Sequence, residues 1–311
     1  MNIVLLDRKT LGQAPKLEDL QQLGNCTFYE STKTEEVAER VKDAEVIITN
    51  KVIVNRDAML AATKLKLICI AATGTNNVDL QAAKELGIPV KNVSGYSTES
   101  VAQHTFAMLL AFQNKISYFD NYVKSGKYCN SDTFTHLQPI WELHGKRFGI
   151  IGLGTIGKRV AEIATCFGAE IVYHSTSGKN NDASYQQIEL SELLKTCDII
   201  SIHAPLNDST SNLLTYDLMR LMPSHAVLIN TGRGGIINET DLARIIDEDL
   251  IGGACIDVYA KEPISANNPL LHVKNQQKLL LTPHVAWSST EAINMVIRKT
   301  IENIKSISLQ S

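Results

Sequence analysis

The sequence predicts an α/β protein with two doubly wound parallel sheets, and three observations lead to this prediction. Short apolar runs alternate with helical segments in both halves of the chain, which is typical of parallel sheets covered by helices on both faces. A Gly-x-Gly-x-x-Gly motif stands in mid-chain between a buried strand and a helix. The chain has 311 residues, enough to bury two cores.

The first 92 residues show the alternation clearly. The last strand expected in this part, 89–91, is followed by a polar stretch, SGYST at 94–98, which we interpret as a domain boundary. A long apolar helix is expected directly after it, at 99–112. The expected strands are 3–6, 26–29, 46–49, 67–70 and 89–91, and the expected helices are 17–23, 35–41, 56–62 and 80–86.

Residues 113–141 lose regular periodicity but stay rich in aromatic side chains. Aromatic residues outside a regular element often form an interface, although local packing explains them as well. The alternation of strands and helices then resumes over 147–168, 169–194, 198–219, 225–247 and 251–257. A last strand is expected at 278–281 and an amphipathic helix at 289–309, which could return to the first domain.

The mid-chain motif is Gly152-Leu153-Gly154-Thr155-Ile156-Gly157, after the apolar run 148–151 and before the helical pattern of 158–167. In this context Gly152 permits a tight turn, Gly154 lets a pyrophosphate approach the backbone, and Gly157 lets helix and strand pack closely. The helix N-terminus offers free N–H groups to the phosphates. The motif therefore predicts dinucleotide binding.

Bulk composition excludes several classes of function. The formal charge of −3 with mixed signs argues against a nucleic-acid partner, and no apolar run is long enough to span a bilayer. The six cysteines have neither paired nor C-x-x-C spacing, so we expect neither disulfides nor a metal site. We expect a soluble protein of the reducing cytoplasm.

Three charged or titratable residues follow three strands of the second domain: Arg233, Glu262 and His284. Parallel strands place their C-terminal ends along one crevice, the same crevice that holds a dinucleotide. An arginine there can clamp a carboxylate, and a histidine beside a carboxylate can pass a proton near neutral pH. Together they indicate hydride transfer to a 2-keto acid, although each alone could be a turn residue, a solvated acid or a strand-end cap.

One further candidate lies in the first domain, where the fourth strand is followed by Thr73 and Gly74. Their amides could bind an anion at the C-terminal end of the strand. A turn before a helix capped by Asp79 explains the same residues equally well.

The sequence closely resembles the NAD(P)-dependent D-2-hydroxyacid dehydrogenases over nearly its whole length. Within this family it is most similar to the glycerate dehydrogenase, or hydroxypyruvate reductase, type. The resemblance rests on seven stretches: GTNNVDL (74–80), GYSTESVAQHT (95–105), ELHGKRFGIIGLGTIG (142–157), HAPLNDST (203–210), INTGRGG (229–235), DVYAKEP (257–263) and TPHVAWSS (282–289).

The resemblance implies a Rossmann coenzyme domain, 99–286, inserted in a flavodoxin-like substrate domain, 1–98 and 287–311. It implies His284 as the acid/base, Glu262 as its partner and Arg233 as the clamp for the substrate carboxylate and carbonyl. It also implies a homodimer formed through the coenzyme domain. The implied substrate contacts are Asn50, Lys51, Thr73, Gly74 and Tyr96. The implied coenzyme contacts are Gly152, Gly154, Thr155, Ile156, Gly157, His203, Ala204, Pro205, Asn230, Thr231 and Asp257.

The chain departs from many relatives after the strand 170–173. Where they carry an aspartate that binds the adenosine ribose, this sequence has Ser175, followed by Thr176, Ser177 and, two residues on, Lys179. The departure predicts that NADP(H) is accepted beside NAD(H), with a modest lean to NADP(H).

The predicted reaction is reduction of hydroxypyruvate or glyoxylate to D-glycerate or glycolate. A phosphoglycerate dehydrogenase remains an alternative, disfavoured because the chain leaves no room for a regulatory domain. A formate dehydrogenase is disfavoured because Glu262 stands where such relatives carry Gln. A dinucleotide-sensing binding protein, like the corepressors with this fold, also remains, since these keep Arg, Glu and His.

Overall fold

The computed structural model describes residues 1–12, 17–134, 138–179 and 182–308. The chain divides into two compact units. Unit 1 comprises Met1–Ser97 and Ser288–Ser311, and unit 2 comprises Thr98–Trp287. Each boundary lies one residue from the position expected from the sequence, and unit 2 is a single insertion in unit 1.

The sheet of unit 1 has five parallel strands in the order β2-β1-β3-β4-β5. This is the flavodoxin-like order, in which the strand sequence reverses beside the first strand. The strands are β1 (Asn2–Leu5), β2 (Asn25–Phe28), β3 (Val46–Thr49), β4 (Leu67–Ile70) and β5 (Val90–Asn92).

Both faces of this sheet are buried, which explains why its central strands read as continuous apolar runs. Successive side chains of a strand point to opposite faces. In β4, Leu67 and Cys69 accordingly join one core cluster, and Ile68 and Ile70 join the other.

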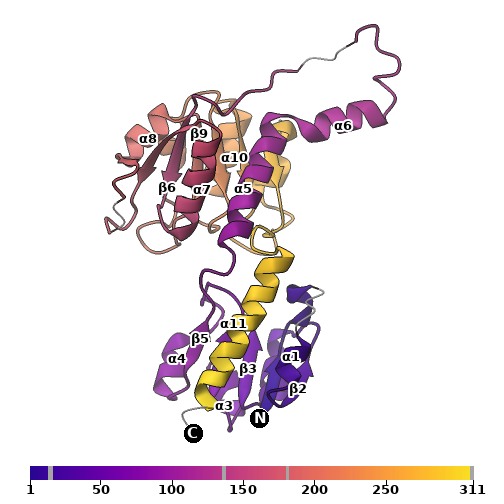
Figure 1. The fold of residues 1–311 in the computed structure, drawn as a ribbon, viewed down its shortest axis with the longest axis vertical. Helices are drawn as coiled ribbons and strands as arrows, with labels where there is room; N and C mark the ends of the chain where they lie inside the picture. Colours follow the sequence, from indigo (N-terminus) through magenta and orange to yellow (C-terminus); the bar gives the residue numbers. More distant parts are fainter. Residues whose placement is uncertain (13–16, 135–137, 180–181, 309–311) are drawn as a thin grey trace. The chain divides into compact units, whose positions relative to one another are not determined.

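The helices of unit 1 include the last helix of the chain, α11 (Thr290–Ser308), which packs beside β4 along one face of the sheet (Figure 1). Its buried Val296, Ile297, Ile301 and Ile304 belong to the cluster on that face. The predicted end of this helix, Leu309, lies outside the described residues. The other helices are η1 (Arg8–Leu11), α1 (Glu18–Gln21), η2 (Thr34–Glu36), α2 (Val37–Val41), α3 (Arg56–Ala61) and α4 (Leu80–Glu85).

The sheet of unit 2 has seven parallel strands in the order β12-β11-β10-β9-β6-β7-β8. From β6 onward this is the Rossmann order with one further strand at the edge. The two parallel sheets confirm the predicted fold class. The strands are β6 (Arg147–Ile151), β7 (Glu170–His174), β8 (Gln186–Gln187), β9 (Ile199–Ile202), β10 (Val227–Asn230), β11 (Gly253–Ile256) and β12 (Leu279–Leu281).

Helices cover both faces of this sheet and bury two further clusters, one around Phe148 and Ile150 and one around Ile200 and Leu228. Neighbouring residues of one strand again divide between the two clusters. The helices are α5 (Thr98–Gln113), α6 (Ile116–Lys124), α7 (Thr155–Cys166), α8 (Leu190–Thr196), α9 (Tyr216–Met219), α10 (Glu239–Asp247), η3 (Pro269–His272) and η4 (Gln276–Lys278).

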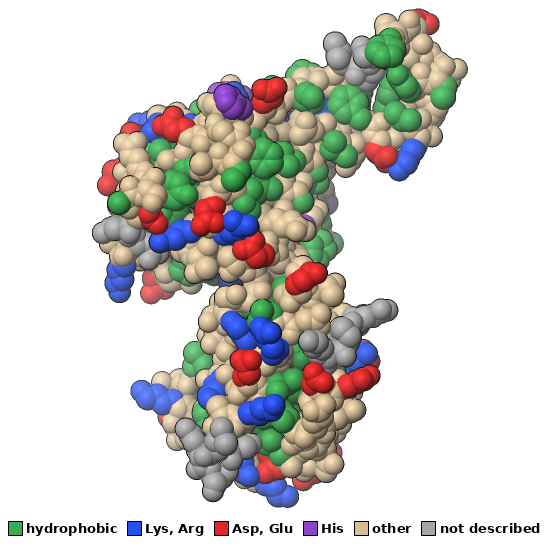
Figure 2. Space-filling model, in the orientation of Figure 1, with side chains coloured by type: hydrophobic (Ala, Val, Ile, Leu, Met, Phe, Trp, Pro, Cys, Tyr) green, Lys and Arg blue, Asp and Glu red, His purple; other side chains and the backbone are tan. Residues whose placement is uncertain are grey.

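The segment after α5 contains a helix that the sequence analysis did not predict. Helix α6 begins after Lys115, which has a left-handed φ of 51°, and it buries none of its side chains. In Figure 1 it leads away from the sheet of its own unit, and Figure 2 shows apolar side chains along it. The exposed apolar residues of this segment are Ile116, Tyr118, Val123, Tyr128, Phe134, Ile140 and Trp141.

Among the described residues, no helix is both long enough and apolar enough to cross a bilayer.

Candidate active site

The glycine turn joins β6 to α7, and its geometry explains the spacing of the three glycines. Gly152 has φ +94°, and a Cβ there would lie 2.8 Å from the backbone of Ala204. A Cβ on Gly157 would lie 2.3 Å from the carbonyl oxygen of Gly152. A Cβ on Gly154 would meet nothing within 4 Å, so open space lies in front of the backbone at this residue. The turn therefore fits a pyrophosphate at Gly154.

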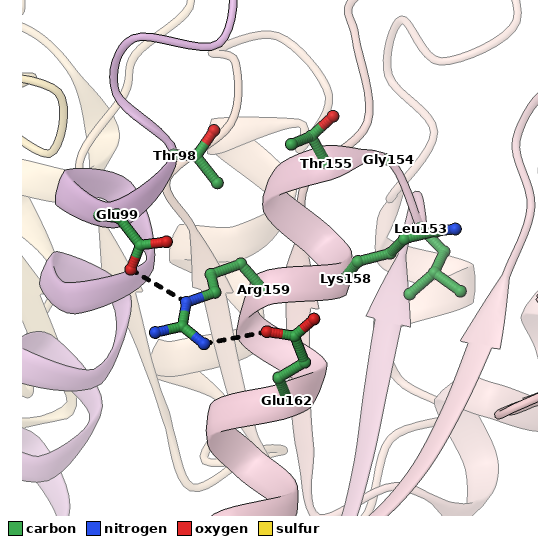
Figure 3. A pocket seen from close by; sticks show the side chains of 8 residues that line it. All are labelled: Thr98, Glu99, Leu153, Gly154, Thr155, Lys158, Arg159 and Glu162. Atoms are coloured by element: carbon green, nitrogen blue, oxygen red, sulfur yellow. Dashed lines mark hydrogen bonds and ion pairs between the residues drawn. The ribbon is translucent and has the colours of Figure 1, made fainter.

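A pocket of about 610 Å³ lies beside this turn, along the first turns of α5 and α7 (Figure 3). Arg159 forms one side of it, held between Glu99 and Glu162 at 2.9 Å from each. Gly154 precedes α7 without a capping side chain among the described residues, so the first amides of the helix are available to an anion. The lining residues are Thr98, Glu99, Leu153, Gly154, Thr155, Lys158, Arg159 and Glu162.

The neighbouring strand ends carry the other predicted coenzyme residues. His203, Ala204 and Pro205 follow β9, next to β6 in the sheet. Burial lowers the pKa of the His203 imidazole to about 3, so the ring is neutral at physiological pH. Its Nε2 lies 2.8 Å from the Ser201 hydroxyl, and its buried Nδ1 has no hydrogen-bond partner among the described residues.

Hydrogen bonds fix the backbone and side chains at the end of β10. The Asn230 side chain accepts a hydrogen bond from the Gly232 amide and donates one to the Arg233 carbonyl, which shapes the turn that carries Arg233. Thr231 is buried, and its hydroxyl lies 2.9 Å from that of Thr105 on α5. Backbone and side chain at this strand end are therefore positioned before any ligand binds.

Ser175 follows β7, where the adenosine ribose is read in this fold. Its hydroxyl oxygen is buried and has no hydrogen-bond partner among the described residues. A buried hydroxyl normally finds a partner. Together with the open space at Gly154, this orphaned atom shows that the unit fits a dinucleotide.

Glu262 and His284 meet at the ends of β11 and β12. The His284 Nδ1 atom lies 2.6 Å from Glu262 Oε2, and Glu262 Oε1 accepts the Tyr259 amide at 3.0 Å. With Nδ1 turned to the carboxylate, Nε2 is the ring atom left to face a substrate. The pair is half-buried, with side-chain exposures of 23% for His284 and 32% for Glu262.

His284 is held in an unusual backbone conformation, with φ +53°. Asp257, fully buried at the end of β11, maintains this turn: its carbonyl accepts the His284 amide, and its carboxylate accepts the amides of Val285 and Ala286 and the hydroxyl of Thr282. Non-glycine residues with positive φ cluster at functional sites, where surrounding bonds hold the strain. Asp257 therefore fixes the backbone that presents His284.

Arg233 follows β10, the neighbour of β11, so the three predicted catalytic residues stand at the ends of three adjacent strands. The structure brings Glu262 and His284 into direct contact. The Arg233 guanidinium donates a hydrogen bond to the carbonyl of Gly232 at 2.8 Å.

The predicted substrate residues of unit 1 gather at the C-terminal edge of its own sheet. Asn50 and Lys51 follow β3, and Thr73 and Gly74 follow the adjacent β4. The Thr73 hydroxyl donates to the Val93 carbonyl at 3.1 Å, and half-buried Tyr96 packs on the core beside α11.

Asp7, which the sequence analysis did not single out, organises this edge. Its buried carboxylate follows β1 and accepts the amides of Asn50, Lys51 and Val52 at 2.6–3.1 Å. A charged residue directly after a buried strand was the available signal. Among the described residues, Asn50 Oδ1 is left buried without a partner, in keeping with a ligand at this loop.

No group of histidine, cysteine, aspartate and glutamate side chains in the described part of the chain could hold a metal ion.

Comparison with known proteins identifies the family. Residues 106–286 match the model of the D-isomer specific 2-hydroxyacid dehydrogenase NAD-binding domain. A glycerate dehydrogenase of Methylorubrum extorquens is 34% identical over 305 residues, covering 97% of this chain and 95% of its own. A hydroxypyruvate reductase of Blautia hydrogenotrophica is 33% identical over 314 residues, covering 98% and 96%.

Solved structures agree over the full length. An acyclic imino acid reductase in complex with NADPH and D-Arg superposes with a TM-score of 0.87 at 31% identity, covering 100% of this chain and 98% of its own. The D-lactate dehydrogenase of Aquifex aeolicus, complexed with NAD and lactic acid, has the same fold, with a TM-score of 0.85 at 24% identity and coverage of 100% and 96%. Sequence and fold agree: this chain belongs to the D-isomer specific 2-hydroxyacid dehydrogenase family.

Proposed function

We propose that this dehydrogenase reduces hydroxypyruvate and glyoxylate to D-glycerate and glycolate with NAD(P)H. The observation that carries the proposal is the 2.6 Å contact between His284 and Glu262 at the strand ends of a dinucleotide-binding unit. A histidine paired with a carboxylate can deliver a proton at neutral pH. A keto-acid reductase needs such a proton donor at the carbonyl oxygen of its substrate.

In the proposed mechanism the nicotinamide, when bound, supplies the hydride for the carbonyl carbon. Arg233 binds the carboxylate and carbonyl oxygens of the substrate through its guanidinium fork. His284 donates its Nε2 proton to the carbonyl oxygen, and Glu262 orients the ring through its contact with Nδ1. In the reverse direction His284 takes the hydroxyl proton, so the same pair serves both directions.

The names of relatives support small 2-keto acids as substrates. Glycerate dehydrogenase and hydroxypyruvate reductase are joined by a glyoxylate reductase of Aeropyrum pernix, 35% identical over 89% of this chain and 83% of its own. A D-3-phosphoglycerate dehydrogenase of Methanocaldococcus jannaschii is 33% identical, but this chain spans only 54% of it. For binding of the substrate carboxylate we propose Asn50, Lys51, Thr73, Gly74 and Tyr96 of unit 1.

For the coenzyme we propose that both NAD(H) and NADP(H) are used, with a modest preference for NADP(H). Ser175 brings no carboxylate to the ribose, so it neither accepts from both ribose hydroxyls as an acid does nor repels a 2′-phosphate. Its orphaned hydroxyl can donate to a phosphate oxygen. We also propose that the enzyme works in the reducing cytoplasm, because its six cysteines have neither paired nor C-x-x-C spacing.

We also propose a homodimer in which the segment 113–141 contacts a second copy. Its exposed apolar side chains and the absence of buried residues in α6 support this, because an apolar helix face needs a partner. Residues 135–137 lie outside the described part of the chain.

The test is a steady-state assay of NADH and NADPH consumption with hydroxypyruvate, glyoxylate, pyruvate and 3-phosphohydroxypyruvate. We expect the highest kcat/KM for hydroxypyruvate or glyoxylate. A clear preference for 3-phosphohydroxypyruvate would replace the proposal by phosphoglycerate dehydrogenase. Tight coenzyme binding without turnover of any keto acid would instead indicate a dinucleotide-sensing protein.

A further inference from the structure

The ion pair between Lys158 and Asp182 joins two parts of unit 2 that flank the expected position of the adenosine ribose. Lys158 lies in the second turn of α7, one turn beyond Gly154, and lines the pocket at the glycine turn (Figure 3). Asp182 belongs to the chain that follows β7, as does Ser175. The Lys158 ammonium lies 2.9 Å from Asp182 Oδ2.

Several bonds fix Asp182 in this position. Its Oδ1 accepts the Ser184 amide at 3.0 Å, and its own amide donates to the hydroxyl of Tyr173 at 3.2 Å. Tyr173 is a buried residue of β7, two positions before Ser175. The carboxylate is therefore tied to the end of the strand whose following residue is expected to face the ribose.

Lys158 and Asp182 are both charged over the whole pH range in which enzymes work. The hydrogen bond from Lys158, followed by those from Ser184, lowers the pKa of the Asp182 carboxyl to about 2. The same bond raises the pKa of the Lys158 ammonium. A change of pH within this range does not separate the two groups, whereas a competing anion can take the place of the carboxylate.

We propose that Lys158 is the cation that reads the 2′ position of the coenzyme, and that Asp182 is a built-in competitor for it. A 2′-phosphate takes the place of the Asp182 carboxylate on Lys158, whereas the 2′-hydroxyl of NAD(H) leaves the ion pair intact. Lysine binds phosphate as a point charge, and the neutral Ser175 adds a hydroxyl donor.

This competition between the 2′-phosphate and Asp182 for Lys158 explains why we expect only a modest preference for NADP(H) over NAD(H). With the pair formed, Lys158 contributes no net charge at the ribose, so a 2′-phosphate gains the ammonium only by giving up the contact between Lys158 and Asp182. Lys179, further along the same stretch, is exposed and adds a second positive charge. The inference rests on the proposed binding of a nicotinamide dinucleotide and adds the residues that discriminate its two forms.

The experiment compares 2′,5′-ADP with 5′-AMP, which differ only in the 2′-phosphate, by calorimetric titration of the full-length protein. We expect Asp182→Asn to raise the affinity for 2′,5′-ADP about threefold, because an exposed competing charge is removed. Lys158→Gln should lower that affinity about tenfold. The affinity for 5′-AMP should stay within about twofold in both variants, and the NADPH/NADH ratio of kcat/KM should follow the ADP results.

The double variant Lys158→Gln/Asp182→Asn provides the decisive comparison. If the two residues act on the same phosphate, removing Asp182 frees no ammonium once Lys158 is absent, so the gain in affinity for 2′,5′-ADP should be clearly smaller in the Lys158→Gln background than in the wild type. The exposed pair Lys42–Glu39 of unit 1 supplies matched controls, Lys42→Gln and Glu39→Gln, which should change neither affinity.

The outcomes separate this inference from the proposed function. Equal changes for 2′,5′-ADP and 5′-AMP would show that the pair only holds the loop, and would overturn the inference. Additive effects in the double variant would also overturn it. If the wild-type protein bound neither nucleotide, the dinucleotide function itself would fail, and the inference with it.

Discussion

At the scale of single residues, the site depends on how His284 is held. Its backbone has a left-handed φ, and its amide donates to the Asp257 carbonyl. Its Nδ1 atom contacts the Glu262 carboxylate. The resemblance implies Asp257 as a contact of the nicotinamide carboxamide, and that role stays a prediction. The structure adds that its carboxylate already accepts three hydrogen bonds from the chain around His284.

Replacing His284 tests the proton donor. We expect His284→Ala to lose about 10²- to 10⁴-fold in kcat, the usual contribution of a general acid, while the dissociation constant of NAD(P)H stays unchanged. His225, paired with Asp198 at 2.7 Å in the same unit, is a matched histidine–carboxylate pair, and His225→Ala should keep full activity. Wild-type turnover of every keto acid by His284→Ala would remove His284 from the mechanism.

Replacing Glu262 tests the anion behind the histidine. The carboxylate lies 2.6 Å from Nδ1 and so holds Nε2 free for the substrate. Glu262→Gln keeps the shape of the side chain but removes the charge behind the imidazole, so we expect kcat for reduction to fall while the dissociation constant of NAD(P)H stays unchanged. The measurement is steady-state kcat with one keto acid beside a coenzyme titration, and a wild-type kcat would contradict the role of Glu262.

Replacing Ser175 tests the reading of the ribose. A carboxylate at this position accepts from the ribose hydroxyls of NADH and repels a 2′-phosphate, so Ser175→Asp should shift the preference toward NADH. The shift should equal the contribution of one charged hydrogen bond, about 1.5–3 kcal/mol. It is measured as the ratio of kcat/KM for NADH and NADPH, and strong NADH selectivity of the wild type, unaltered by the aspartate, would contradict the prediction.

At the scale of elements, the junction of β6 and α7 contains one glycine that folding requires, Gly157, and one that coenzyme binding is expected to require, Gly154. Gly157 has no room for a side chain because the carbonyl of Gly152 faces it, whereas Gly154 faces open space. The same substitution at the two glycines should therefore have different effects.

We expect Gly157→Ala to destabilise the fold by about 1–3 kcal/mol, since the added methyl group forces helix and strand apart. Gly154→Ala should leave the melting temperature nearly unchanged and weaken dinucleotide binding, because the methyl group occupies the space in front of the backbone. Thermal unfolding and coenzyme titration of both variants measure the two effects. Normal coenzyme affinity of Gly154→Ala would show that the pyrophosphate binds elsewhere.

The sequence predicts an element well when the pattern that identifies it lies within the element itself. Buried strands such as β3 and β4 are continuous apolar runs, and their bounds match those predicted. Helix α6 was missed because it has only nine residues and its apolar side chains, such as Ile116 and Val123, are exposed instead of joining the core of its own unit. The two-residue strand β8 is too short to leave any pattern.

The candidate site divides in the same way. Arg233, Glu262 and His284 were predicted because each follows a recognisable strand. The Lys158–Asp182 pair was not, because it depends on the path of the chain after β7, which no local pattern encodes. The bonds from Asp7 to 50–52 likewise span more than forty residues.

At the scale of the whole molecule, the proposed division of roles follows the two units. Unit 2 contains the glycine turn, Ser175 and all three predicted catalytic residues, and unit 1 contains the predicted substrate loops. We therefore expect substitutions in the substrate loops to alter KM for the keto acid and to leave coenzyme affinity unchanged.

The proposed homodimer is tested at this scale. Ile116 and Val123 are both more than half exposed on α6, and two carboxylates there would have to be buried in a dimer interface. We expect the wild type to be a dimer at micromolar concentration, with an interface on the order of 2,000 Å² or more, and Ile116→Asp/Val123→Asp to be a monomer. Light scattering measures both, and Leu60→Asp in unit 1 is the exposed control.

The return of α11 to unit 1 has a consequence for synthesis on the ribosome. The strands of unit 1 leave the ribosome first, but about 190 residues of unit 2 follow before Val296, Ile297 and Ile301 can cover the sheet. At about 5–20 residues per second, that apolar face stays open for roughly 10–40 s. Unit 2 can complete its fold in this interval while unit 1 waits, so we expect the apolar face of unit 1 to be the part of the nascent chain most prone to aggregation.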